Sequence, residues 1–135
     1  MKKNAASVLL LCCLLCLAGC NLRASVSGTQ LLKEGTATKI AVTSMPESYD
    51  YSFSGEDAAA VINYLSGLNL VTDYPENPNE YDGMTWVITV EYTDGSTATV
   101  YHFGNMFIRA DSGPWYKMSF DEANQFESLL NELNH

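Results

Sequence analysis

Residues 86–118 decide the fold, and their sequence is WVITVEYTDGSTATVYHFGNMFIRADSGPWYKM. Apolar and polar side chains alternate through this stretch, a pattern typical of half-buried β-strands. Three turn signals interrupt the alternation: Asp94-Gly95, Gly104-Asn105 and Asp111-Ser112-Gly113. The first two favour two-residue hairpin loops, and the third favours a three-residue loop with its glycine in the left-handed conformation. The stretch therefore predicts an antiparallel meander of four strands.

The loop lengths also predict which residues face each other across these strands. The first loop sets Ile88 opposite Tyr101, and the second sets Tyr101 opposite Ile108. The third loop sets Ile108 opposite Tyr116. Three registers assigned independently thus agree on one apolar face, which indicates a common core side. The predicted core face consists of Trp86, Ile88, Val90, Tyr101, Phe103, Met106, Ile108, Tyr116 and Met118.

The segment before the meander predicts further elements. Residues 38–43 alternate as a first strand, 45–48 form a turn, and 49–53 form a second short extended piece. A helix follows from Ser54, with apolar side chains at helical spacing and an acidic residue at its third position for a capping box. Residues 69–85 form a long acidic loop.

The last segment predicts a second helix and completes the fold class. Ser119 is placed to cap this helix, and Glu122 completes a capping box. We therefore expect an α+β fold in the order β-α-β-β-β-β-α, with a four-stranded antiparallel meander, an N-terminal strand and two helices packed on one face. This order resembles the cystatin arrangement in topology only. The sequence has no cystatin inhibitory motif, so the resemblance implies no function.

Residues 1–20 carry an export signal. Lys2 and Lys3 precede an apolar run that is too short to span a membrane comfortably. The run ends in Leu17-Ala18-Gly19-Cys20, which resembles the lipobox of bacterial lipoproteins. The resemblance implies a diacylglyceryl group on the Cys20 thiol, cleavage after Gly19, and lipid anchoring at the extracytoplasmic face of a bacterial cell membrane.

Cleavage would divide the chain into three parts. Residues 1–19 are the signal peptide, 20–37 are the lipid anchor and a flexible tether rich in small polar residues, and 38–135 are a single domain. All four cysteines lie in the first twenty positions, so the processed chain is expected to have no disulfide. These cysteines are Cys12, Cys13, Cys16 and Cys20.

The charge of the chain excludes some partners. Its formal net charge is −9, from seven basic and sixteen acidic side chains. Loss of Lys2 and Lys3 would leave five basic side chains and a charge of −11. Such a domain repels nucleic acid and anionic headgroups, so membrane contact is expected to come from the lipid on Cys20.

Residues with catalytic chemistry are few. No nucleophile, zinc or phosphate-loop motif is present, and the histidines are His102, predicted on the strand face opposite the core, and the terminal His135. We therefore expect no cofactor and no enzyme activity. The loop acids offer an alternative, either carboxylate-dependent hydrolysis or calcium binding together with Asn77 and Asn79. These acids are Asp73, Glu76, Glu80 and Asp82.

The sheet face opposite the core is the predicted ligand face. The registers place large aromatic residues there beside two basic ones, and Arg109 is expected to stack on the ring of Trp115. The ligand-face candidates are Phe107, Arg109, Trp115, Lys117 and His102. Two alternatives remain open. In the first, the N-terminal strand, the tether or a partner copy covers this face. In the second, a four-residue third loop turns Trp115 and Lys117 inward.

These features favour a lipid-anchored binding or interaction module whose partner is a protein, a peptide or a glycan. One alternative is an inhibitor of an exported enzyme that uses the long loop or the hairpin tips. The other is a small exported hydrolase that uses the loop carboxylates.

Overall fold

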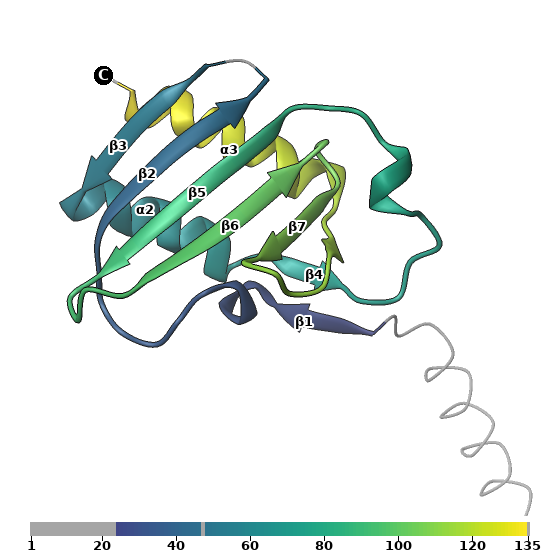
Figure 1. Cartoon of the computed structure of the whole chain (residues 1–135), viewed down its shortest axis with the longest axis horizontal. Coiled ribbons are helices and arrows are strands. Elements are labelled where there is room, and N and C mark those ends of the chain that lie inside the picture. Colours follow the sequence, from purple (N-terminus) through teal and green to yellow (C-terminus); the bar gives the residue numbers. More distant parts are fainter. Residues whose placement is uncertain (1–23, 47, 135) are drawn as a thin grey trace, which may run out of the picture.

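The computed structural model describes residues 24–46 and 48–134 (Figure 1). These residues form a mixed α+β unit with one antiparallel sheet of eight strands and two α-helices, together with two short 3₁₀ helices, η1 and η2. The strands lie in the order β1-β4-β8-β7-β6-β5-β2-β3. The elements in chain order are β1 (Ser25–Ser27), η1 (Gly28–Leu31), β2 (Ala37–Met45), β3 (Asp50–Ser54), α2 (Gly55–Ser66), β4 (Asn69–Val71), η2 (Pro78–Glu80), β5 (Thr85–Tyr92), β6 (Thr97–Phe103), β7 (Phe107–Ala110), β8 (Tyr116–Lys117) and α3 (Phe120–Leu133).

Both α-helices lie behind the sheet in Figure 1, and we call the side they cover the inner face. The predicted α+β class with an antiparallel sheet is confirmed. The sheet is larger than expected, because β1 and β4 extend it beyond β8. No helix in the described ranges is long and apolar enough to cross a membrane.

The hairpin of β5 and β6 differs from its predicted register by one residue. Trp86 pairs with His102, where Phe103 was expected. The Tyr92 N–H donates to the Ser96 carbonyl at 2.9 Å, so the loop contains three residues, 93–95. A slip of one position moves every side chain of a strand to the opposite face of the sheet.

The Asp94 side chain explains why this loop is longer than predicted. Its Oδ1 accepts hydrogen bonds from the Ser96 hydroxyl at 2.6 Å and from the Ser96 amide at 2.8 Å. These bonds lower the pKa of the Asp94 carboxyl. Gly95 takes the left-handed position with φ 83°. Such a three-residue loop is the common alternative to the two-residue turn that an Asp-Gly pair also favours.

The corrected register exchanges the two faces of β6. Val100 and His102, predicted to face outward, are buried on the inner face at 0% and 1% exposure. Tyr101 and Phe103, predicted for the core, lie on the outer face instead. The outer face therefore contains two aromatic side chains that the predicted register had assigned to the core.

The turn between β6 and β7 also shifts the ladder. Gly104 and Asn105 both have positive φ, as the predicted turn requires, and the Met106 N–H donates to the Phe103 carbonyl at 3.2 Å. The ladder nevertheless resumes with Phe103 opposite Phe107. Met106, predicted for the core face, is therefore left outside the strand pairing.

The hairpin of β7 and β8 has its predicted register, with Ile108 opposite Tyr116. The left-handed residue in the turn is Asp111, with φ 47°, and not the expected Gly113. Asp111 is fixed there because its carboxylate accepts from the Thr99 amide at 3.1 Å, and its own N–H donates to the Thr99 carbonyl at 2.7 Å. The four-residue alternative for this loop is excluded.

The two α-helices begin in different ways. The Ser54 side chain makes no capping hydrogen bond, so the predicted capping box of α2 is absent. The predicted box of α3 is present, because Ser119 Oγ accepts from the Glu122 amide and Glu122 Oε2 accepts from the Ser119 amide. From this start, α3 buries Ala123, Phe126 and Leu130.

Residues 25–31, which composition placed in the tether, form β1 and η1 in the structure. Ser25–Ser27 pair with β4, and Leu31 of η1 is 2% exposed in the core. Gly28 lies where a Cβ atom would be 1.8 Å from the Leu65 carbonyl oxygen, so only glycine fits against the end of α2. The predicted signal peptide and Cys20 lie outside the described residues.

Candidate functional site

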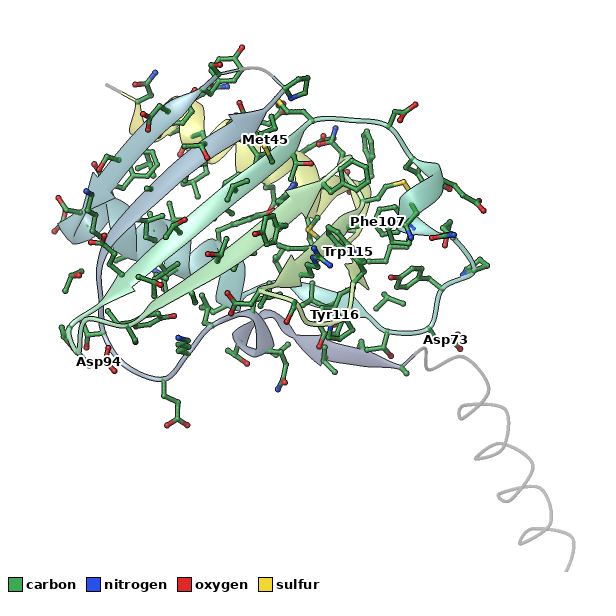
Figure 2. All side chains as sticks on the ribbon, viewed as in Figure 1. Met45, Asp73, Asp94, Phe107, Trp115 and Tyr116 are labelled. Atoms are coloured by element: carbon green, nitrogen blue, oxygen red, sulfur yellow. The ribbon has the colours of Figure 1, made fainter. Side chains whose placement is uncertain are left out.

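A groove of about 340 Å³ opens on the outer face, between η2 and the strands β6 and β7. Its lining combines four aromatic side chains from three segments with one arginine, and it includes no acidic residue. Figure 2 shows Trp115 and Phe107 together at this end of the sheet. The lining residues are Pro78, Asn79, Tyr81, Thr85, Tyr101, Phe103, Arg109 and Trp115.

Strand register brings the groove residues together. Tyr101 lies opposite Arg109 in the β6–β7 ladder. The β7–β8 ladder pairs Ile108 with Tyr116. One position closer to the turn, the same antiparallel register sets Arg109 opposite Trp115. Side chains directly across an antiparallel pair are close neighbours. Arg109 is therefore flanked by one aromatic ring from each neighbouring strand.

The Arg109 guanidinium lies over both rings. Its Cζ atom is 4.6 Å from the centroid of the Trp115 ring and 5.3 Å from that of Tyr101. The predicted stacking of Arg109 on Trp115 is thus confirmed. These two contacts hold the planar group by attraction to the ring faces, which leaves its N–H edge for other partners.

The side-chain nitrogens of Arg109 make no hydrogen bond or ion pair with the described residues. Its Nε is buried without a hydrogen bond, and the guanidinium makes no ion pair with an acidic side chain in the described ranges. This is unusual, because the sequence has sixteen acidic residues and only seven basic ones. The buried Nε–H is left without a hydrogen bond, which costs free energy, and the charge has no acidic counterpart.

The other predicted ligand-face residues have structural partners. Phe107 is completely buried, with its ring centroid 5.7 Å from that of Tyr74 and 5.4 Å from that of Tyr81. The segment between β4 and β5 therefore covers this part of the outer face, a cover that the sequence alternatives had not named. Lys117 forms an ion pair with Glu76 of that segment. Phe107 is therefore not available to a ligand in this arrangement, and the Lys117 ammonium is already paired.

The covering segment is held in place by a hydrogen bond next to the groove. The Tyr74 hydroxyl donates to the Trp115 carbonyl at 2.9 Å. Asn77 caps η2, because its side-chain oxygen accepts from the Asn79 amide at 3.1 Å. The long loop predicted over 69–85 is thus partly ordered by β4 and η2, and it forms one wall of the groove.

His102 belongs to the core and not to the predicted ligand face. Its Nε2 lies 3.2 Å from the hydroxyl oxygen of Tyr64, and that hydroxyl donates to the Glu122 carbonyl at 2.8 Å. Tyr64 must therefore accept from Nε2, which assigns the histidine proton to that nitrogen. The other nitrogen, Nδ1, is buried without a hydrogen-bond partner in the described ranges.

Burial lowers the pKa of His102 to about 4, so the ring is neutral at neutral pH. Burial also raises the pKa of Tyr64, with a smaller contribution from the Glu122 carboxylate. His102 stacks on Phe126 at 5.0 Å between ring centroids. His102 and Tyr64 thus connect β6, α2 and α3, and their contacts serve the packing of the core.

The loop acids do not gather in the described ranges. No three Asp, Glu, His or Cys side chains come together there as a metal ion requires. Within the predicted set, Glu76 is bound to Lys117. None of the four acids, Asp73, Glu76, Glu80 and Asp82, lines the groove.

A larger hollow of about 650 Å³ lies between β4, β8 and the start of α3. Its charged side chains already have partners in the fold. Lys117 is paired with Glu76, and Glu122 accepts from the amides of Asn69 and Ser119. We therefore regard the smaller groove around Arg109 as the better candidate for ligand binding.

Sequence reasoning identified Arg109 and Trp115 but missed three of the aromatic walls. Tyr101 and Phe103 were missed because the predicted β6 register turned them inward. Tyr81 was missed because its segment has no periodic pattern. Comparisons with protein-family models, curated proteins and solved structures found no match for this chain.

Proposed function

We propose that this protein is an exported bacterial lipoprotein, anchored by lipid on Cys20, whose domain binds a ligand in the groove around Arg109. The observation that carries the binding role is the guanidinium held between two aromatic rings without a counter-charge. In this proposal the groove is a recognition site of a binding module and not a catalytic centre.

Support for the anchor comes from the lipobox-like Leu17-Ala18-Gly19-Cys20 and the apolar run before it. The first strand begins at Ser25, five positions after Cys20. Five residues of extended chain span roughly 17 Å at most. A lipid on Cys20 would therefore hold this domain close to the bilayer.

A Cys20→Ala variant tests the anchor. Without the thiol no diacylglyceryl group can be attached, so we expect the uncleaved chain or a form released from the membrane fraction. The readouts are gel mobility, labelling with a fatty-acid analogue, and partition between membrane and aqueous fractions. Normal processing and full membrane retention of the variant would contradict lipid anchoring.

Support for the groove comes from its mixed chemistry. Ligand sites combine apolar walls with a few fixed polar groups, and here aromatic rings surround one oriented cation. Arginine and aromatic residues are also the side chains most enriched at binding hot spots.

Fluorotryptophan labelling tests the groove. The sequence has two tryptophans, Trp115 in the groove and Trp86 in the core, so fluorine NMR gives one reporter and one internal control. Acetylated peptides, neutral oligosaccharides and acidic sugars are added separately. We expect at least one class to shift the Trp115 resonance saturably and to leave that of Trp86 unchanged. If no class shifts it, the binding proposal is wrong.

A pair of charge variants supplies the matched control. Arg109→Gln removes the cation in the groove, whereas Lys39→Gln removes a cation from β2, away from the groove lining. Binding should fall only in Arg109→Gln.

A further inference from the structure

We infer that the groove takes the C-terminal carboxylate of a peptide with an apolar last residue, bound by the Arg109 guanidinium. This inference rests on the proposed binding function, and it specifies the chemistry of the ligand. It follows from the parts of Arg109 that remain accessible, from the charge balance, and from the ring surfaces that Arg109 covers.

The terminal amino groups of Arg109 are the donors that the groove offers. Nε is buried, whereas neither Nη group is buried, and neither makes a hydrogen bond with a described residue. The two Nη groups lie side by side in the plane of the guanidinium, at a spacing that matches the two oxygens of a carboxylate. Because the Trp115 and Tyr101 rings hold that plane, a carboxylate would meet donors that are already oriented.

The charge balance favours a ligand with one negative charge at the contact point. Arg109 is the only basic residue among those lining the groove, and Lys117 nearby is paired with Glu76. A single arginine matches the charge of a carboxylate, whereas a phosphate group with nearly two negative charges would stay partly uncompensated. The net charge of −9 would further penalise a ligand with several negative charges.

The covered ring surfaces favour a peptide over a sugar acid. Sugars bind aromatic side chains through an open ring face, but Arg109 already lies over one face of the Trp115 ring and one face of the Tyr101 ring. The remaining walls come from Phe103, Tyr81 and Pro78, which suit an apolar side chain next to the carboxylate. Asn79, also in the lining, offers an amide that can pair with a peptide group.

The test uses the full-length, fluorotryptophan-labelled chain in detergent micelles. The probes are acetylated tripeptides that end in alanine, leucine or phenylalanine, each as the free acid and as the C-terminal amide. Glucuronate and a neutral chitotriose form separate arms. We expect the acids ending in leucine or phenylalanine to shift the Trp115 resonance saturably, with the matching amides weaker by about tenfold or more.

Variants show whether the preference for the free acid over the amide depends on Arg109. Arg109→Gln should bind acid and amide alike, Arg109→Lys should retain part of the preference for the acid, and Lys39→Gln should behave like the unchanged chain. The Trp86 resonance, in the core at 5% exposure, shows that each variant is folded. Retention of the full acid preference in Arg109→Gln would overturn the inference.

The outcomes separate the inference from the proposed function. Equal binding of acid and amide, or a Trp115 shift with a sugar but not with the peptide acids, refutes the carboxylate inference and leaves the groove as a binding site. If no probe shifts Trp115, both the inference and the binding proposal are refuted.

Discussion

Replacement of His102 should remove most of the loss of stability between about pH 7 and pH 5. The histidine pKa is about 4 in the folded protein, against 6.5 for an unperturbed side chain. In this pH range His102 therefore binds a proton in the unfolded chain but not in the folded one. The contribution of His102 to stability is fully present above pH 6.5, and it is lost as the pH falls toward 4.

The size of the effect follows from the two pKa values. At pH 7 the folded state is almost fully deprotonated and the unfolded state mostly so, whereas at pH 5 only the unfolded state is protonated to a large extent. The free energy of unfolding should fall by about 2 kcal/mol between these pH values through His102 alone. The physical cause is the burial of the ring, which removes the water that would stabilise its charged form.

The assay is urea unfolding at a series of pH values, on a form of the chain that starts at Asn21. His102→Gln is the comparison, because its amide can still donate to the Tyr64 hydroxyl but does not titrate. The carboxylates and His135 are common to both proteins and cancel in the difference. If the two curves of free energy against pH run parallel from pH 7 to pH 5, our account of His102 is refuted.

Three further substitutions test the packing around the core and the groove. Gly28→Ala places a methyl group 1.8 Å from the Leu65 carbonyl oxygen and should destabilise the chain by about 2 kcal/mol in urea unfolding, whereas Thr29→Ala should have little effect. Phe107→Ala empties a fully buried site beneath Tyr81 and should reduce stability by about 3 kcal/mol, with faster proteolysis between β4 and β5; a loss below about 1 kcal/mol would contradict that burial. Ser119→Ala removes the cap of α3 and should reduce the free energy of unfolding by about 1 kcal/mol, and unchanged stability would show that the capping box contributes nothing.

Several features of the fold were predictable because they depend on local chemistry. The alternation along β5 and the helical spacing after Ser119 each bury one side of one element, so a short stretch of sequence is sufficient. The capping box of α3 is equally local, and it formed as predicted. The stacking of Arg109 on Trp115 was also predictable, because the β7–β8 register followed from one short turn.

The register of β6 was not predictable from its own sequence. Its two faces are both apolar, with Ala98 and Val100 on one and Tyr101 and Phe103 on the other. A strand of this kind fits the core in either register, so hydrophobicity alone does not choose between them. The choice came from the hydrogen bonds of one turn, in which Asp94 binds Ser96 and adds a residue to the loop.

The sequence by itself determined the α+β class, the export signal that we propose, and the opposition of Arg109 and Trp115. Only the tertiary structure placed His102 in the core, joined Ser25–Ser27 to the sheet, and closed the groove with Tyr81. The physical reason is the range of the contacts. Residues 72–84 have no periodic pattern, and their aromatic side chains gain their role only when Phe107, far along the chain, offers an apolar surface on the outer face.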